Sequence, residues 1–490
     1  MTATAGLQCA TLPVPLDYQD EHCDQTLELN LARYPAVKQS KGTILVNFGG
    51  PGLDGRNHLA GSGGPPILGL SDFDFVTWDP RGTGTTLPAN CYTNLNDSIK
   101  ATAAIPYPRN ATVAELSKAW DAVANITPVC EKTLGVNGTL IGSAYTARDM
   151  LQIVDALNED GLLRYYGQSY GSALGQIFAA MFPDRVGRII IDGVLNPHQY
   201  ISGTDYQELA TTDAVLDGFF SSCEARPDIC NLTMLDTSQQ SVRQQFDIML
   251  NKLKEDGPDT SFDPPLDYVT LVSSLYDDTL KSHTGWPGTA LSLYAILKND
   301  KALYANVSTA SIGGTGKAVP LFPGVSTSQF GEITSAIRCS DVITRLPSPE
   351  ADVDIAKHFF PQSQFAGGLF VSTANIPCMQ WPFKAKEQYT GNFDVRTKNP
   401  ILVVNNIYDP VTSLDAALNA SATFHGSGLL VQNSYGHIST SSISKCTTSH
   451  VRDYFVNGTL PQPGTVCEAD YPAFYTDEEL SRAYKAVSDE

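Results

Sequence analysis

The sequence predicts a mostly parallel, doubly wound α/β sheet that is interrupted by a large, mainly helical insertion. Apolar segments of strand length alternate with helical patterns up to residue 195, and this alternation returns at residue 400. Between these parts, helical patterns and loops occur without clean strand–helix units. We therefore expect one sheet built from residues 1–197 and 396–490, with residues 198–395 forming a cap.

The first strands are expected before residue 80. Residues 12–17 (Leu-Pro-Val-Pro-Leu-Asp) have a turn-like composition, and the alternation over Leu27–Ala32 suits an edge strand. Gly42–Asn47 and Asp74–Trp78 are apolar runs that predict buried strands. The glycine-rich stretch Asp79–Gly84 follows the second run. Because no Gly-Lys-Ser/Thr follows it, a structural turn with an Arg–Asp pair is favoured over a phosphate-binding loop.

The next part of the chain is expected to complete the first half of the sheet. Residues 88–140 are predicted to be rich in loops. Thr146–Asn158 has apolar side chains at helical spacing, which predicts an amphipathic helix with Asp149 near its start. Arg188–Val194 predicts the last strand before the insertion. The insertion should contain helices over the ranges Thr211–Cys223, Ser238–Glu255 and Pro287–Asn299.

After the insertion, a strand, a helix and a last strand are predicted over Pro400–Asn405, Ser413–Phe424 and Gly428–Gln432. The tail from Cys446 is expected to be an extension fixed by a disulfide bond.

The central motif is Gly167-Gln168-Ser169-Tyr170-Gly171, which has the pattern Gly-x-Ser-x-Gly. An apolar run, Leu162–Tyr166, predicts a strand before it, and Ala173–Phe182 predicts a helix after it. Strand, tight turn and helix are the context in which this pattern forms a nucleophile elbow. The two glycines leave room for the strand and the helix to approach each other. Ser169 is therefore the candidate nucleophile.

Length and composition limit the classes of function. The 490 residues suffice for one large domain with an insertion, and 42% hydrophobic with 17% charged residues are typical of a soluble globular protein. The net charge of −20 disfavours a nucleic-acid partner. No apolar run reaches 18 residues, so no membrane span is predicted.

Several features predict a secreted eukaryotic protein. Asn-x-Ser/Thr glycosylation frames occur at Asn96, Asn110, Asn125, Asn137, Asn231, Asn306, Asn419 and Asn457. The ten cysteines are compatible with an oxidising compartment. The pairs Cys223/Cys230 and Cys446/Cys467 lack metal-site spacing with nearby histidines, so disulfides rather than zinc are expected, and no metal or cofactor is predicted. The first six residues lack the charged and apolar regions of a secretory signal. We expect that the signal sequence has been removed and replaced by an initiator methionine.

A base and an orienting acid are required to activate a serine. In α/β sheets with a serine nucleophile, the triad residues occur along the chain in the order serine, acid, histidine. Asp409 follows the strand that begins at Pro400, and His437 follows the last predicted strand, so both occur in this order after Ser169. The alternatives are an Asx turn at Asp409, with Asp415 as a second candidate acid, and a surface-loop role for His437.

Phe48-Gly49-Gly50-Pro51-Gly52 after a strand predicts an oxyanion loop, with the amides of Gly50 and Tyr170 as donors. A simple tight turn is the alternative.

These motifs resemble the tripeptidyl aminopeptidase and proline iminopeptidase family of α/β-hydrolases. The resemblance extends in order over most of the chain, through Asn47–Gly52, Asp79–Gly84, Gly167–Gly171, Asp192–Val194, Ala336–Asp341, Cys378–Pro382, Asp409–Thr412, Gly436–His437 and Tyr454–Cys467. Phe48 departs from it, since iminopeptidases carry histidine there and the tripeptidyl branch usually proline. The resemblance implies that carboxylates of the cap hold the free amine of the substrate, with Glu332 and Asp341 as candidates by position.

The resulting hypothesis is a secreted serine exopeptidase that acts on small peptides through an acyl-enzyme. The alternatives are an esterase, lactonase or acyl-transferring hydrolase acting on a small secondary metabolite, since one triad serves many acyl groups, and a binding protein that keeps the fold without the chemistry. The substrate is expected to be a small peptide or acyl compound, and the sequence does not indicate an oligomeric state.

Overall fold

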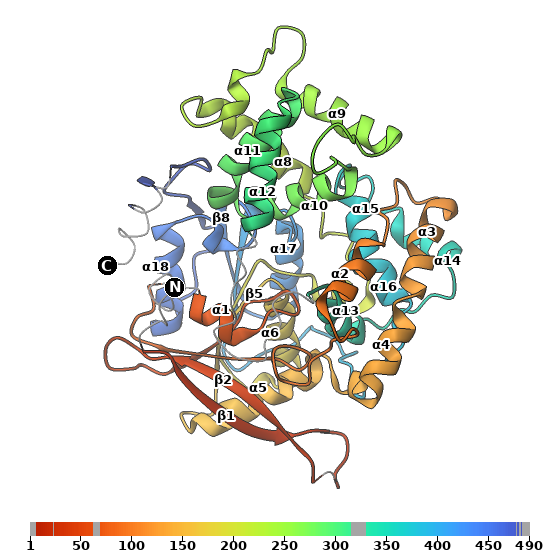
Figure 1. The fold of residues 1–490 in the computed structure, drawn as a ribbon. Coiled ribbons are helices and arrows are strands. Elements are labelled where there is room, and N and C mark those ends of the chain that lie inside the picture. The colour runs from red at the N-terminus through yellow and green to blue at the C-terminus, as the bar shows by residue number, and fades with distance from the viewer. Residues whose placement is uncertain are drawn as a thin grey trace.

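A computed structural model describes residues 6–22, 24–61, 69–314, 330–476, 478–479 and 482, so that Cys23 lies outside the described residues. Its centre is a nine-stranded sheet in the order β1-β2-β4-β3-β5-β6-β7-β8-β9 (Figure 1). The strands β1 and β2 are antiparallel to their neighbours, and the pairs from β4 to β9 are parallel. The strands are β1 (Gln8–Pro15), β2 (Thr26–Tyr34), β3 (Thr43–Asn47), β4 (Asp74–Trp78), β5 (Leu163–Gln168), β6 (Val186–Asp192), β7 (Leu402–Tyr408), β8 (Gly428–Tyr435) and β9 (Val466–Glu468).

Helices cover both faces of this sheet. Those of the first half are α1 (Gly55–Gly61), α2 (Leu95–Ala103), α3 (Val113–Ala124), α4 (Thr127–Leu134), α5 (Ser143–Leu157) and α6 (Tyr170–Met181), and those of the last part are α17 (Leu414–Thr423) and α18 (Lys445–Asn457). Alternate residues of the central strands point to opposite faces, as the strand period of two requires. Leu45, Tyr165 and Val403 pack in the same core as α5, α6 and α17. Val46 and Tyr166 pack with α1 and α18 on the other face. The predicted fold class is thus confirmed.

Between β6 and β7 the described residues form helices α7 (Pro197–Ser202), α8 (Thr212–Ala225), α9 (Val242–Asp256), α10 (Tyr268–Thr279), α11 (Ser282–Leu297), α12 (Lys301–Gly314), α13 (Phe330–Asp341), α14 (Pro349–Ala356), α15 (Gly367–Phe370) and α16 (Ile376–Met379). Helices α8 to α12 form one group, and α13 to α16 lie beside α2 to α4 (Figure 1). A second core, separate from those on the faces of the sheet, runs through α8 to α12 and extends to α3 and α14 to α16. Within it, Trp286 packs edge-on against Phe219.

Four local predictions were wrong. Residues 12–17 were expected to turn, but Pro13 and Pro15 lie in β1, which is the edge strand in place of β2. Proline is tolerated there because an edge strand has amides that need no ladder partner. Residues 88–140 are mostly helical rather than loop-rich, and β9 rather than β8 is the last strand. The short strand β9 pairs with β8 in parallel. It forms only through this pairing with a strand from another part of the chain, so its own sequence does not predict it.

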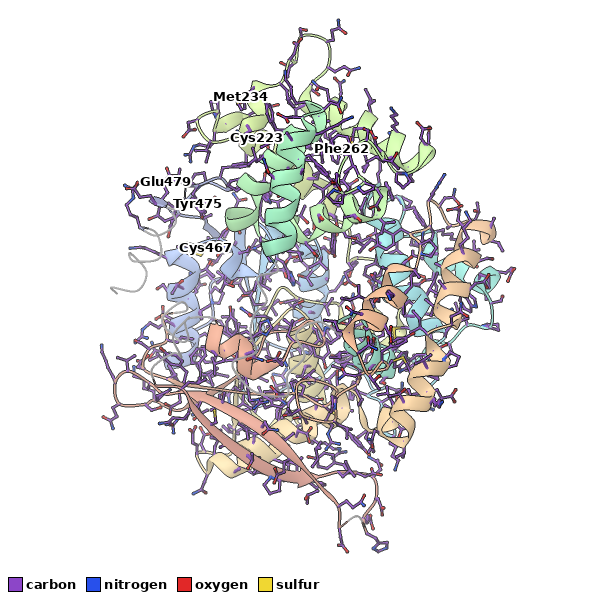
Figure 2. The ribbon with its side chains drawn as sticks, in the orientation of Figure 1. Cys223, Met234, Phe262, Cys467, Tyr475 and Glu479 are labelled. Atoms are coloured by element: carbon purple, nitrogen blue, oxygen red, sulfur yellow. A yellow bond between two sulfur atoms is a disulfide. The ribbon has the colours of Figure 1, made fainter. Side chains whose placement is uncertain are left out.

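Four disulfide bonds fix the described chain. The pairs Cys223–Cys230 and Cys446–Cys467 are confirmed, and Cys91–Cys130 and Cys339–Cys378 also form. The C-terminal extension also contacts the insertion, because the Arg226 guanidinium donates to the carbonyl of Phe474 and pairs with Glu479. Figure 2 shows Tyr475 and Glu479 on the side of the insertion where Cys223 of α8 lies.

The turn after β4 is fixed by two buried ion pairs rather than by one local pair. Arg81 donates to both carboxylate oxygens of Asp149 in α5, at 2.8 and 3.0 Å, and both side chains are inaccessible to solvent. Asp79 pairs instead with Arg56 of α1. Asp149 therefore neutralises a buried guanidinium and is not simply a charge near a helix start.

Candidate active site

Ser169 occupies a strained turn between β5 and α6. Its φ of 56° and ψ of −122° lie in a region that residues other than glycine rarely adopt. Its amide donates to the carbonyl of Asp192 at the end of β6 (2.9 Å). The neighbouring glycines are required by space, since a Cβ at Gly171 would lie 2.7 Å from the carbonyl oxygen of Asn47. Ser169 remains partly accessible while its neighbours Gln168 and Tyr170 are buried.

Asp409 and His437 form a hydrogen-bonded pair. The Nδ1 atom of His437 lies 3.0 and 2.9 Å from the two carboxylate oxygens of Asp409. Asp409 is fully buried, and its carboxylate also accepts the amides of Val411, Thr412 and Ile438 at 2.9–3.0 Å. These donors hold the carboxylate in place. Because Nδ1 is bound to the acid, Nε2 is the nitrogen left to exchange a proton with a nucleophile.

The turn after β6 lies between the serine and the histidine. Asp192 ends β6 and binds the Ser169 amide through its carbonyl, while its carboxylate accepts from the amide and hydroxyl of Ser439. A Cβ at Gly193 would lie 3.3 Å from Cε1 of His437. Ser169 and His437 therefore both lie against the turn after β6. They follow β5 and β8 at the carboxyl edge of the sheet, where open α/β sheets bind their ligands.

The glycine-rich loop after β3 packs against the elbow. A Cβ at Gly49 would lie 2.8 Å from the Cβ of Ser169 and 3.2 Å from the amide nitrogen of Tyr170. Gly49 has a φ of 90°, and its amide donates to Oδ1 of Asn47 (3.0 Å). The amide of Tyr170 opens α6, and first-turn amides have no partner within a helix. Gly50 and Tyr170 thus stay the expected oxyanion donors.

The two predicted amine-binding carboxylates lie in buried hydrogen-bond networks. Asp341 accepts from the amide and hydroxyl of Ser143 and from the hydroxyl of Tyr200, and burial raises the pKa of Asp341 to about 6. Ser143 also bonds the Tyr170 hydroxyl (2.7 Å), so Asp341 supports the residue that follows Ser169. Glu332 accepts the amides of Cys91 and Tyr92.

Glu208 is a carboxylate near the site that sequence reasoning missed. Its Oε2 atom is buried and has no hydrogen-bond partner among the described residues. Burial, followed by the neighbouring charge of Asp205, raises the pKa of Glu208 well above its usual range, while Arg338 opposes this. Glu208 lies close enough to Asp409 for the two charges to interact. No sequence pattern marks Glu208, because its environment is assembled from distant segments.

The segment after Glu208 fixes its position against the acid loop. The hydroxyl of Thr211 donates to the carbonyl of Asp409, and that of Thr212 donates to the carbonyl of Pro410 (2.6 Å). The insertion also contacts the histidine directly, since the amide of His437 donates to the carbonyl of Leu280 between α10 and α11 (3.0 Å). The helical insertion therefore borders the candidate site on two sides.

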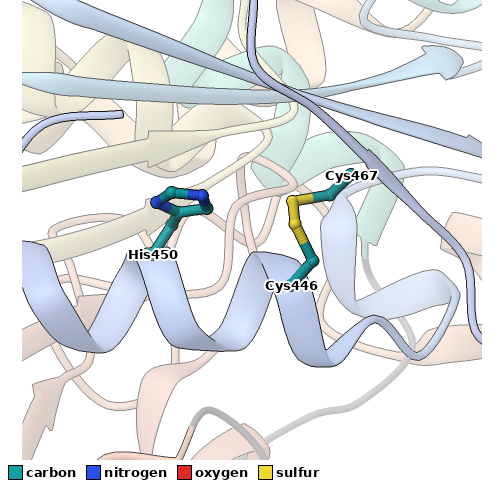
Figure 3. Close-up of side chains that lie close together, drawn as sticks. All are labelled: Cys446, His450 and Cys467. Atoms are coloured by element: carbon teal, nitrogen blue, oxygen red, sulfur yellow. A yellow bond between two sulfur atoms is a disulfide. The ribbon is translucent and has the colours of Figure 1, made fainter. Parts of the chain in front are cut away.

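One cluster has the residue types of a metal centre. Cys446, His450 and Cys467 lie with their ligand atoms within 4.8 Å of one another (Figure 3). The expectation that no histidine lies near this cysteine pair was wrong, because His450 is one helical turn after Cys446. The two sulfur atoms nevertheless form a disulfide, which leaves no thiolate to bind a metal.

Comparison with known proteins gives two family matches. Residues 43–235 match the "alpha/beta hydrolase fold" family, and residues 363–467 match the "TAP-like protein" family. A tripeptidyl aminopeptidase of Streptomyces lividans is 24% identical, with 94% of this chain and 83% of the relative covered. The serine protease Hip1 of Mycobacterium tuberculosis is 26% identical, with 94% and 87% covered. A protein named carboxylesterase B, from the same species, is also 26% identical, with 94% and 86% covered. In the described residues no helix is long and apolar enough to cross a membrane.

Proposed function

Because the chain is an α/β-hydrolase that resembles the tripeptidyl aminopeptidases over most of its length, we propose that it is a secreted serine aminopeptidase that releases short peptides or residues from a free amino end. The hydrogen-bonded pair of Asp409 and His437 beside the turn that also binds Ser169 is the observation that carries this proposal.

In the proposed mechanism, the Ser169 hydroxyl attacks the carbonyl carbon of the scissile bond and passes its proton to Nε2 of His437. Asp409 stabilises the imidazolium and holds its orientation. The amides of Gly50 and Tyr170 stabilise the oxyanion of the tetrahedral intermediate. His437 then protonates the leaving amine, and water hydrolyses the acyl-enzyme through the same base.

We assign the substrate amine to Glu208 rather than to Glu332 or Asp341. Asp341 is bound to protein donors through both carboxylate oxygens, and Oε2 of Glu332 accepts two backbone amides, while Oε1 of Glu332 and Oε2 of Glu208 both lack a partner among the described residues. Glu208 is preferred to Glu332 because the segment after it is hydrogen-bonded to the Asp409 loop. A buried carboxylate oxygen without a partner is costly, and a substrate ammonium group would supply the missing charge and donors. Glu208 is also near Asp409, so a bound amine would lie close to the reacting groups.

A matched pair of substrates tests this assignment. We expect a tripeptidyl anilide with a free amine to be hydrolysed with a kcat/KM at least about 10-fold higher than its N-acetyl form, as a single charge-assisted contact allows. The substitution Glu208→Gln should reduce this ratio to near one, while Glu224→Gln on the exposed face of α8 should leave it unchanged. Equal rates for free and blocked substrates in the wild-type enzyme would exclude amine recognition.

The same residue predicts a pH dependence. Since the pKa of Glu208 is raised, its carboxyl is neutral at low pH and becomes a better partner for an ammonium group as the pH rises through that pKa. KM for the free-amine substrate should therefore fall with rising pH, until the substrate amine itself loses its proton. KM for the N-acetyl substrate, and KM of the Glu208→Gln variant, should not show this fall with rising pH.

Secretion is supported by the disulfide bonds and by the glycosylation frames. Four disulfides are typical of an oxidising compartment. Seven of the eight frame asparagines are exposed, and Asn231 is half-buried. We expect the protein from a eukaryotic secretory host to shift to a lower apparent mass when N-linked glycans are removed enzymatically. An unshifted band would contradict glycosylation at these sites.

An esterase remains the second candidate, because a relative named carboxylesterase B is as similar to this chain, at 26% identity, as the serine protease Hip1 is. Hydrolysis of short-chain p-nitrophenyl esters together with no activity on free-amine peptides would favour it.

A further inference from the structure

A cavity of about 230 Å³ lies within the helical insertion and the segments that pack on it. Helices α8 and α9, the start of α10, the segment before α3 and residues 360–365 line it. None of its lining residues belongs to the loops that carry Ser169, Asp409 and His437. The cavity is therefore separate from the candidate active site.

Two cations of this cavity lack an acidic partner. In the part of the chain that the structure describes, neither the Arg109 guanidinium nor the Lys254 ammonium forms an ion pair. Most other arginine side chains of this acidic protein are paired, including Arg243 of the same cavity, which contacts Asp217 and Asp247. Burial and the charge of Arg109 lower the pKa of Lys254, as two cations facing one site require.

The acidic side chains near these cations are already engaged. Asp213 accepts from the hydroxyl of Ser363 (2.6 Å) and from the amide of Gln364 (3.1 Å). Asp247 is paired with Arg243. Glu115 acts on both cations from a distance, but its carboxylate binds the Lys118 ammonium and the backbone amide of Arg109. These hydrogen bonds leave the negative charge of Asp213 in place, so the wall carries acidic as well as basic side chains, and among the described residues Arg109 and Lys254 are its two cations without an ion pair.

Apart from the charged groups and the polar side chains of Asn251 and Gln364, the wall is apolar and largely aromatic. The Lys254 ammonium lies 5.7 Å from the ring centre of Tyr268, and Phe246 and Phe360 line the same space, together with Leu216, Leu250 and Phe365. Phe246 is fully buried and Tyr268 is half-buried. An inorganic anion would contact the two cations but would leave the apolar side chains of the wall without a partner. A ligand with an aromatic ring would also contact these side chains.

We propose that this cavity binds a small organic anion with an aromatic body, such as an arylcarboxylate. The carboxylate would lie between Arg109 and Lys254, where a charge-assisted contact to each cation is stronger than a neutral hydrogen bond. The ring would lie against Phe246, Tyr268 and Phe360. A cavity of about 150 Å³ lined by apolar side chains already holds benzene, so the space here suffices for a ligand of benzoate size. The proposal does not depend on the catalytic function.

Binding of benzoate to the complete protein, followed by calorimetry or ligand-observed NMR, tests this inference. We expect saturable binding at millimolar concentration, with no such binding for the neutral isostere benzamide. The substitution Lys254→Met should weaken benzoate binding by about 10-fold, because it removes one charge-assisted contact. Lys252→Met, on the same helix but outside this cavity, is the matched control and should bind like the wild-type protein.

Arg109→Gln provides a second variant with the same expected loss, and it changes a side chain that is exposed rather than buried. A midpoint of thermal unfolding equal to that of the wild-type protein would show that both variants are folded. The inference is overturned if benzoate does not bind, if benzamide binds equally well, if inorganic phosphate binds while benzoate does not, or if Lys254→Met and Lys252→Met bind benzoate alike.

Discussion

Replacing Ser169 by alanine should lower kcat by at least about 10⁴-fold on both peptide anilides and esters. Alanine has no hydroxyl to form the acyl-enzyme, whereas the oxyanion donors and the substrate contacts stay in place. KM is therefore expected to change little. The measurement is single-turnover and steady-state hydrolysis by the purified variant.

Ser221→Ala is the matched control for this substitution. Ser221 is an exposed serine of α8 whose hydroxyl bonds only within its own helix, so its loss should leave kcat within about twofold of the wild-type value. An Ser169→Ala variant with a substantial fraction of the wild-type kcat would show that another group attacks the substrate.

Replacing Asp409 by asparagine should lower kcat by about 10⁴-fold. The carboxylate accepts from Nδ1 of His437, and an amide NH₂ group facing that nitrogen would favour the opposite tautomer, in which Nε2 carries the proton and cannot act as a base. Three backbone amides also point at the carboxylate, so the geometry of the loop should survive in part through the amide oxygen.

Asp415→Asn separates the two candidate acids. Asp415 is exposed in the first turn of α17, and its loss removes only a favourable interaction with the helix dipole. We expect kcat of this variant to stay within about twofold of the wild-type value. A large loss in Asp415→Asn with normal activity in Asp409→Asn would reverse the assignment.

The sheet could be predicted from the sequence because its central strands are buried on both faces. Such strands are continuous apolar runs bounded by glycine and polar residues, and β3, β4 and β5 were found within one or two residues of their bounds. The resemblance to tripeptidyl aminopeptidases is likewise confirmed by the relatives. β1 was missed because Pro13 and Pro15 are tolerated only at the edge of a sheet, and that position depends on strand order.

The chemistry near the site was less predictable where it depends on distant contacts. Ser169, Asp409 and His437 could be proposed because each follows a predicted strand. The burial of Glu208 and the pairing of Arg81 with Asp149 arise from segments far apart in the chain, which no local pattern reveals. His450, by contrast, lies one helical turn after Cys446, so its place beside the Cys446–Cys467 disulfide follows from a local spacing that the sequence interpretation overlooked.

The most direct test of the account is to identify the residue that reacts with a fluorophosphonate probe. This reagent phosphonylates the activated serine of serine hydrolases, and mass spectrometry of the digested protein locates the adduct. We predict one adduct, on Ser169, that is absent in Ser169→Ala and strongly reduced in Asp409→Asn. An adduct on another serine, or labelling that persists in Ser169→Ala, would contradict the proposed role of Ser169 as the nucleophile.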